Sequence, residues 1–317
     1  MSYSSEFVLK VNEVYHDVEG SDYQDKHPEV FKDEIDRWQK IGQKFLIGYF
    51  NQIRILDIGS GTGFVPLQIC SFLKKEDTFV CSDISQNILD VCQKNVLENN
   101  FPCQTIFKKF DGKSFLLDSN QFDFITLNSV LHHIPDFQPF LKEVNRLLKI
   151  DGRLIICHEP NKSFFCHRFL WPNYKLFSYL ISPKQLLFSV LKRMGLPGLL
   201  KNKSNIGVEN QARINQEVNR RLLEMGFIKS PLTHNQIIEI IDIQSPTAGG
   251  FHKERGIDIL SLVKDYLPNF KVEDFKTYNH LRTLSSRNFL TKWYDQMLAK
   301  IYPHAGSSFS VFIRKVF

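Results

Sequence analysis

Three glycines, Gly59, Gly61 and Gly63, alternate with small polar residues at the end of a short apolar run. Glycine allows a sharp turn and exposes backbone amides that a side chain would otherwise shield from a ligand. Between a strand and a helix, such a loop can hold a nucleotide, although ordinary tight turns show the same spacing. The loop alone therefore indicates a nucleotide-like ligand without identifying it.

Neighbouring residues narrow the choice of ligand. A dinucleotide fingerprint requires a further glycine where this chain has Phe64, and it does not require an acid at Asp57. A carboxylate at Asp57 would repel a pyrophosphate but would suit a cationic ammonium. Asp83, twenty residues after the last glycine, could accept hydrogen bonds from both hydroxyls of a ribose. Its alternative role is the N-cap of the next helix, which Ser82 or Ser85 could equally provide.

These loops need a sheet that brings them together. Short apolar runs separated by amphipathic stretches predict parallel strands joined by crossover helices, and such sheets bind ligands at the carboxyl ends of their strands. We predict a Rossmann-like, doubly wound, mostly parallel seven-stranded α/β sheet. It would have a helical N-terminal lead-in and a helical cap inserted between the fifth and sixth strands. The predicted strands are 54–58, 78–81, 104–108, 122–127, 153–157, 270–277 and 307–314.

Four regions follow from this pattern. The first is a helical N-terminal lid, in which apolar residues recur every three or four positions and should pack on the core (Phe31, Ile35, Trp38, Ile41 and Phe45). The regions are the lid at 1–50, the cofactor-binding core at 51–160, the cap at 161–250 and the remainder of the core at 251–317.

The stretch from Ile55 to Glu159 resembles a class I S-adenosylmethionine-dependent methyltransferase. Five features carry the likeness: L-D-I-G-S-G-T-G, the acid at Asp83, Phe110-Asp111-Gly112, N-S-V-L-H-H-I-P-D from Asn128, and L-L-K-I-D-G-R-L from Leu147. The resemblance covers about a third of the chain directly. It implies an enzyme with S-adenosylmethionine as its cofactor and a last strand that runs antiparallel to the others.

The resemblance also assigns the cofactor-binding residues. Asp57, Gly59, Ser60 and Gly61 would hold the methionine part, Asp83 the ribose, Ile84 the adenine ring, Asp111 and Gly112 the adenine amino group, and Asn128 the sulfonium. Asp-Gly is also a common plain turn. Tyr15 or Tyr23 of the lead-in would close over the cofactor, or would simply pack its helix.

Candidate catalytic residues follow the fourth and fifth strands, at the edge of the sheet where ligands bind. His132 and His133 titrate near neutral pH and could act as a general base, which is needed only for an acceptor that carries a removable proton. His132 matches the position that resembles the catalytic histidine of small-molecule O-methyltransferases, four residues before Asp136. Alternatively, both histidines pack the turn. His158 and Glu159 could orient a hydroxyl or amine of the acceptor, and Glu159 could instead start a turn.

The cap combines aromatic and basic residues. From Asn161 to Val208 there are eight Lys or Arg and no Asp or Glu, and residues 186–193 form an amphipathic stretch. Segment 161–204 could contact an anionic membrane or a lipid-linked acceptor, could hold nucleic acid, or could be a plain cap. The modest net charge of +6 and the absence of a recognised RNA-binding module count against nucleic acid. The polar run 242–247 would line the substrate site or form a simple loop.

Composition sets the remaining limits. The six cysteines form no C-x-x-C pair, so no metal site is predicted, and a reduced, cytoplasmic setting is expected. No signal peptide and no membrane-spanning run is visible.

Together, the motifs and the cap predict an enzyme that methylates a hydroxyl, amine or carbon of a small, hydrophobic or lipid-linked metabolite. An RNA methyltransferase and a non-catalytic cofactor-binding protein remain the alternatives.

Overall fold

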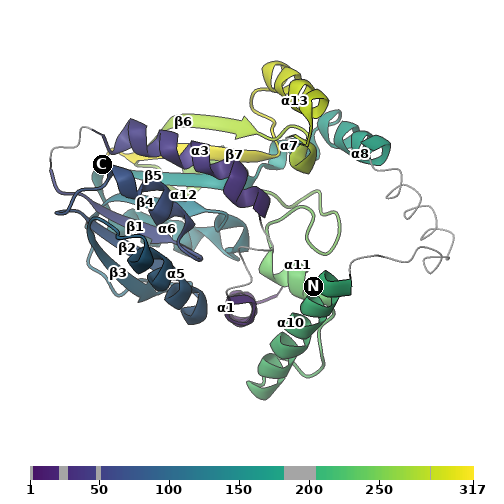
Figure 1. Ribbon diagram of the computed structural model, residues 1–317, viewed down its shortest axis with the longest axis horizontal. Helices are drawn as coiled ribbons and strands as arrows, with labels where there is room; N and C mark the ends of the chain where they lie inside the picture. Colours follow the sequence, from purple (N-terminus) through teal and green to yellow (C-terminus); the bar gives the residue numbers. More distant parts are fainter. Residues whose placement is uncertain (1–2, 21–27, 48–50, 182–204, 286) are drawn as a thin grey trace.

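The computed structural model describes residues 3–20, 28–47, 51–181, 205–285 and 287–317. One seven-stranded sheet forms its centre, in the order β3-β2-β1-β4-β5-β7-β6 (Figure 1). Strands β1 to β5 are parallel, and β7 runs antiparallel to both β5 and β6, as predicted. The strands are β1 Arg54–Ile58, β2 Thr78–Asp83, β3 Gln104–Lys109, β4 Phe122–Asn128, β5 Leu148–Pro160, β6 Phe270–Tyr278 and β7 Ser308–Lys315.

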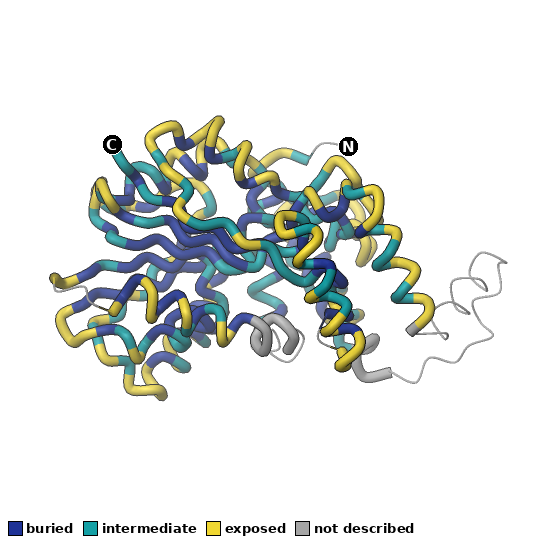
Figure 2. The backbone as a smooth tube through the Cα atoms, turned by 90° about the horizontal axis from the view of Figure 1, so that it is seen from above, coloured by how far each residue is buried: buried dark blue, intermediate teal, exposed yellow. Residues whose placement is uncertain are grey.

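The central strands are apolar because both faces of the sheet are covered, as Figure 2 shows by their burial. On one face α6 and α12 pack against the sheet, and on the other face α3, α4 and α5 do so. The helices over this core are α3 Pro28–Phe45, α4 Phe64–Ile69, α5 Gln86–Glu98, α6 Phe137–Leu147 and α12 Ile259–Tyr266.

Three details differ from the sequence prediction. Strand β5 spans Leu148–Pro160 and so begins five residues before the predicted start at residue 153. Ile35, predicted to pack on the core, is 39% exposed because Glu34 occupies the buried position, where it pairs with Arg37. Helix α13 was not predicted and spans Phe289–Ile301.

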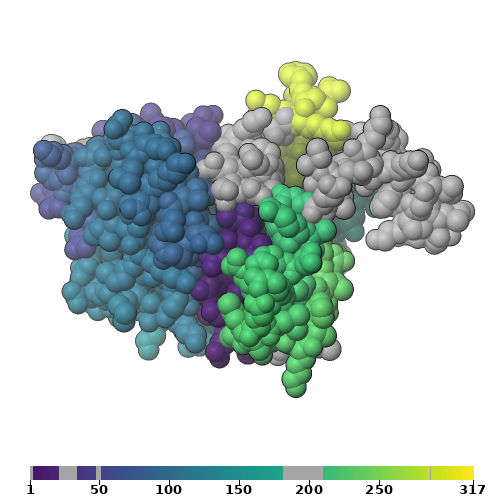
Figure 3. Space-filling model, turned by 60° about the horizontal axis from the view of Figure 1, so that its bottom comes forward, coloured from purple at the N-terminus to yellow at the C-terminus, as the bar shows by residue number. Residues whose placement is uncertain are grey.

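The remaining described helices form two groups beside the sheet. Helix α1 packs with α10 and α11 through one apolar cluster, and it lies between the core and these helices in Figure 3. Helices α7, α8 and α13 share a second cluster. The predicted cap therefore contributes to both groups, and its amphipathic stretch 186–193 lies outside the described residues. These helices are α1 Ser5–Glu19, α7 Lys162–Cys166, α8 Leu170–Ile181, α10 Asn205–Glu224 and α11 His234–Ile241.

No helix in the described part of the chain combines the length and apolar character that crossing a bilayer requires.

Candidate functional site

The glycine loop follows the carboxyl end of β1. Gly59, Gly61 and Gly63 have φ of 69°, 54° and 96°, a conformation that glycine adopts without strain. A Cβ on Gly59 would lie 2.4 Å from Cγ2 of Val130, whereas a Cβ on Gly61 would meet no atom within 4 Å. Gly59 thus allows the loop to pack against the segment after β4, and Gly61 leaves open space beside the loop.

This loop borders what we call the glycine-loop cavity, which is partly open to solvent. Apolar side chains from the ends of β1, α5 and the segments after β3 and β4 form much of its wall. Six of the predicted cofactor residues also line it: Gly59, Gly61, Asp83, Ile84, Gly112 and Asn128.

Asp57 and Ser60 lie beneath the loop. The Asp57 side chain is fully buried and accepts a 2.6 Å hydrogen bond from Oγ1 of Thr126. Burial raises the pKa of Asp57 to about 7, and the hydrogen bond from Thr126 opposes this rise. Ser60 Oγ donates to the backbone oxygen of Asp57 and accepts the N–H of Ser82. Both residues fix the loop against the sheet, and their contact with a ligand stays a prediction.

Asp83 ends β2 with its carboxylate beside the loop. Its oxygens accept the N–H groups of Gly61 and Ser85, each at 3.0 Å. Burial raises the pKa of Asp83, although these hydrogen bonds oppose the rise. Ser85, not Asp83, is the N-cap of α5, because its Oγ accepts the N–H of Ile88. Asp83 is therefore an acceptor at the cavity rather than a helix cap.

The segment after β3 contributes less than predicted. Asp111 is exposed, and its Oδ1 accepts the N–H groups of Lys113 and Ser114 within a turn. Gly112 lines the glycine-loop cavity, and so does Asn128 at the end of β4. The Asn128 carbonyl oxygen accepts a 3.0 Å hydrogen bond from Nε1 of Trp38 on α3, which fixes the orientation of the amide.

Helix α1 covers the glycine-loop cavity from the outside. Asn12 and His16, one helical turn apart, line it, and sequence analysis missed both. Tyr15 instead lines a second cavity and is buried among α10 and α11. Tyr23 lies outside the described residues. The spacing of Asn12 and His16 on a polar helix face was the available signal.

The second cavity, which we call the histidine cavity, is also partly open to solvent and adjoins the first, since His16, Ser129 and His133 line both. Its wall combines the ends of β4 and β5 with α1, α11 and the short helix η5, Arg282–Leu284. His132, His133 and His158 all line it, as does part of the predicted polar run: Asp242, Ser245 and Thr247.

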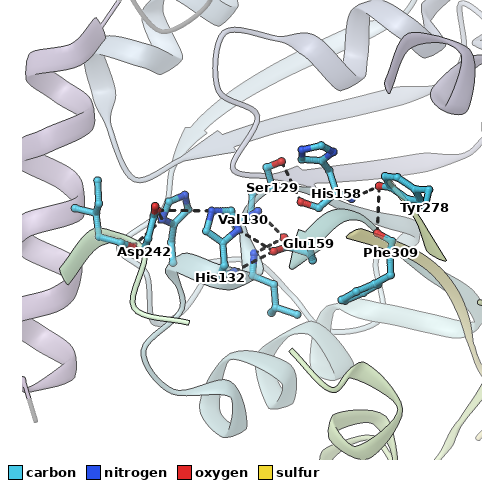
Figure 4. A network of polar contacts seen from close by, with 11 residues as sticks. Ser129, Val130, His132, His158, Glu159, Asp242, Tyr278 and Phe309 are labelled. Carbon is cyan, nitrogen blue, oxygen red and sulfur yellow. Dashed lines mark hydrogen bonds and ion pairs between the residues drawn. The ribbon is translucent and has the colours of Figure 1, made fainter. Parts of the chain in front are cut away.

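The Glu159 carboxylate binds the backbone of the segment after β4 by hydrogen bonds (Figure 4). This fully buried carboxylate accepts the N–H groups of Val130, Leu131 and His132 at 2.7, 2.6 and 3.1 Å. The same carboxylate lies 2.8 Å from Nδ1 of His132. Glu159 therefore acts through His132 and the backbone rather than facing the cavity. Asp136, the partner position suggested by O-methyltransferases, instead caps α6.

The contact between Glu159 and Nδ1 of His132 determines which ring nitrogen carries the proton in the neutral imidazole. A hydrogen bond from Nδ1 to Glu159 leaves the lone pair of neutral imidazole on Nε2, which lies 3.8 Å from Oδ1 of Asp242. Burial lowers the pKa of His132, but Glu159 and, more weakly, Asp242 more than offset this, so the pKa is raised. The two carboxylates thus stabilise the protonated form of His132.

The other two histidines have different partners. His133 Nδ1 lies 2.7 Å from the carbonyl oxygen of Ile241 and 3.3 Å from Oδ1 of Asp242. Side-chain atoms of His132, His133 and Asp242 all lie within 4.8 Å of one another, so a metal ion could bridge them. His158 has φ of 58°, and its Nδ1 lies 3.0 Å from Oε1 of Glu34.

Comparison with known proteins matches part of this chain to a methyltransferase profile. A family profile described as "Methyltransferase domain" matches residues 56–156. Probable polyketide synthase 32 of Dictyostelium discoideum is 29% identical over 144 residues, which cover 38% of this chain and 5% of that protein. Probable polyketide synthase 34 of the same organism is 28% identical over 143 residues, again 38% and 5% of the two chains. The match thus spans about a twentieth of these relatives.

Among solved structures, a SAM-dependent methyltransferase of Methanosarcina mazei is 15% identical, with a TM-score of 0.42, and covers 85% of this chain and 95% of its own.

Proposed function

We propose that this protein is an S-adenosylmethionine-dependent methyltransferase whose acceptor must first lose a proton, with His132 as the base. The match of residues 56–156 to a methyltransferase-domain profile supports the activity. The Glu159–His132 pair carries the proposal, because it directs the imidazole lone pair to the histidine cavity. The cofactor would occupy the adjoining glycine-loop cavity, so the reacting groups would meet where Ser129 and His133 line both cavities.

The glycine-loop cavity fits this cofactor in chemistry. A carboxylate at Asp83 suits the two hydroxyls of a ribose, and the apolar side chains of Ile84 and Phe110 suit a flat base. The open space beside Gly61 leaves room for a ligand against the loop. When bound, S-adenosylmethionine supplies an electrophilic methyl group on a sulfonium.

In the proposed reaction the acceptor proton moves to Nε2 of His132. The acceptor atom then forms a bond to the methyl group as the bond from methyl to sulfur breaks. Glu159 and Asp242 stabilise the imidazolium that results, and positioning of the acceptor in the cavity supplies further acceleration. Glu159 is a positioning residue in this scheme.

We further propose that the acceptor atom is a carbon next to a carbonyl group. Such a carbon acid needs a base, whereas a neutral amine does not. The relatives that are named polyketide synthases support this class, since polyketide chains place methylene groups between carbonyls. A hydroxyl acceptor is the second candidate, because it would need His132 in the same way.

The test uses 2,4-pentanedione as a carbon acid, a phenol as a hydroxyl acceptor and labelled S-adenosylmethionine. We expect His132→Ala to lower turnover about 100-fold or more without changing cofactor affinity. His133→Ala is the matched control and should lower turnover less. Full activity of His132→Ala would refute the base, and methylation of the phenol alone would refute the carbon acceptor. Loss of activity in EDTA that is restored by Zn²⁺ or Fe²⁺ would assign His132, His133 and Asp242 to a metal instead.

A peripheral contact with anionic membranes is a separate proposal, supported by α8 and α13. These helices pack together, with the rings of Phe177 and Tyr294 4.8 Å apart. Their outer surfaces expose large apolar side chains beside Lys175 and Lys292, a combination suited to an anionic lipid surface. The exposed residues are Leu176, Leu180, Phe289, Leu290 and Trp293.

Flotation with vesicles of phosphatidylcholine, with or without phosphatidylserine, tests this contact. We expect binding only to the anionic vesicles at low salt, and Trp293→Ser should weaken it. Leu116→Ser, at an 88% exposed leucine on the segment after β3, is the control and should bind normally. The proposal is wrong if the wild-type protein fails to float.

A further inference from the structure

Arg282 is a cation in the wall of the histidine cavity that the proposed reaction does not use. It begins η5, and three residues separate it from the end of β6 at Tyr278. Its guanidinium lies over the rings of Phe165, Trp171 and Tyr174, with centroid distances of 5.2, 5.8 and 5.5 Å. An aromatic platform of this kind holds a guanidinium in place while leaving its N–H groups available.

This guanidinium has no carboxylate partner within 4 Å among the described residues. The two acids that line the same cavity, Glu19 and Asp242, lie beside histidines instead. Burial removes water from the Arg282 cation and thereby lowers its pKa. No anion in the described part of the chain compensates for this loss of hydration. An anionic ligand would supply that compensation.

The backbone conformation of three residues at the histidine cavity also indicates a functional site. Seven non-glycine residues in the described ranges have positive φ, and four of them are Asn or Asp, which tolerate this conformation. The other three are Ser129, His158 and Arg282, with φ of 59°, 58° and 50°. All three line the histidine cavity. Backbone strain of this kind persists where the surrounding structure holds residues in place for function.

We propose that Arg282 binds an anionic group of the acceptor, a carboxylate or a phosphate, inside the histidine cavity. This inference rests on the proposed function and adds a substrate class to it. The planar guanidinium can donate two parallel hydrogen bonds to either group, which fixes orientation as well as charge. Arg282 would hold the anion while His132 receives the proton.

The test compares two carbon acids that differ in charge. One is 3-oxoadipate esterified with ethanol at C1 only, which keeps its C6 carboxylate, and the other is the neutral diethyl ester. Their binding is measured by calorimetry in the presence of S-adenosylhomocysteine, so that no methyl transfer is required. We expect the wild-type protein to bind the anionic monoester at least 10-fold more tightly than the neutral diester. Competition by inorganic phosphate or by acetate then shows which anion the site accepts.

Substitutions assign the preference to this residue. Arg282→Gln should abolish it, and Arg282→Lys should retain part of it, because lysine keeps the charge but loses the planar fork. Lys175→Gln is the matched control, since Lys175 is an exposed cation over the ring of the same Trp171 and does not line the cavity. It should keep the full preference.

Equal binding of both esters to the wild-type protein would overturn the proposal, and so would an unchanged preference in Arg282→Gln. If that variant does not fold, an unchanged preference in Arg282→Lys together with no competition by phosphate or acetate overturns it equally. His132→Ala should keep the preference while losing turnover, so failure of the anion site can be told apart from failure of the proposed base.

Discussion

Replacing Glu159 by Gln tests how one buried carboxylate sets the chemistry of His132. Glutamine has nearly the same shape, but one carboxylate oxygen becomes an NH₂ group. That group must face either the N–H groups of Val130 and Leu131 or the backbone N–H and Nδ1 of His132. In either orientation the NH₂ group of the substituted glutamine faces backbone N–H groups, so hydrogen-bond donors face donors. In the second orientation the NH₂ group donates to Nδ1 of His132, so the neutral imidazole carries its proton on Nε2 and that nitrogen cannot act as a base.

The expected loss has two parts. Weakening these charge-assisted hydrogen bonds should cost about 2–4 kcal/mol of unfolding free energy, a fall in Tm of roughly 5–10 °C. Loss of the oriented base should lower kcat by about 100-fold or more. Because Glu159 raises the pKa of His132, the activity that remains should reach its plateau at lower pH than in the wild-type protein.

Turnover at several pH values, thermal unfolding and S-adenosylmethionine affinity are the measurements for Glu159→Gln. Asp123→Asn is the matched control, because Asp123 accepts the N–H of Arg54 and pairs with Lys149 at the other end of β4. It should lose stability without changing the pH profile. Wild-type kcat with an unchanged pH profile in Glu159→Gln would refute the reasoning.

Three further predictions concern the glycine-loop cavity. Asp83→Asn should weaken S-adenosylmethionine binding about 10- to 100-fold in calorimetry, since charge-assisted hydrogen bonds contribute about 1.5–3 kcal/mol. Asp77→Asn, at the other end of β2, should bind normally, and equal affinities in the two variants would contradict the role of Asp83. Gly61→Ala should fold with only about 1–2 kcal/mol of strain at its positive φ, yet bind the cofactor more weakly; unchanged affinity would show that the ligand does not approach Gly61. Asp57 has its pKa raised to about 7, so its contribution to stability is full below pH 4 and is lost as the pH rises to about 7. Asp57→Asn should therefore flatten the fall in Tm over this range, and an unchanged slope would argue against the raised pKa.

Local patterns predicted the sheet and the glycine loop well. Strands β1, β2 and β4 are short, mainly apolar runs bounded by turns, so their positions follow from residue type. Asp83 and the glycines follow from their place at strand ends. The antiparallel last strand came from the resemblance, not from periodicity.

Long-range packing explains what the sequence did not reveal. Arg282 lines the histidine cavity because η5 packs against α7 and α8, which lie far from it in sequence. Asn12 shows a helical spacing with His16, but only the packing of α1 brings that spacing to the glycine-loop cavity. Glu159 was predicted to face the acceptor, whereas its burial beneath the segment after β4 makes it the partner of His132. Helix α13 was missed because its outer face is apolar, which hides the usual contrast between helix faces.

The choice of cofactor is the central claim, and calorimetry tests it most directly. The wild-type protein is titrated with S-adenosylmethionine and, separately, with NAD. We predict saturable one-to-one binding of S-adenosylmethionine and no measurable heat with NAD. Tighter binding of NAD, or no binding of S-adenosylmethionine, would contradict the account.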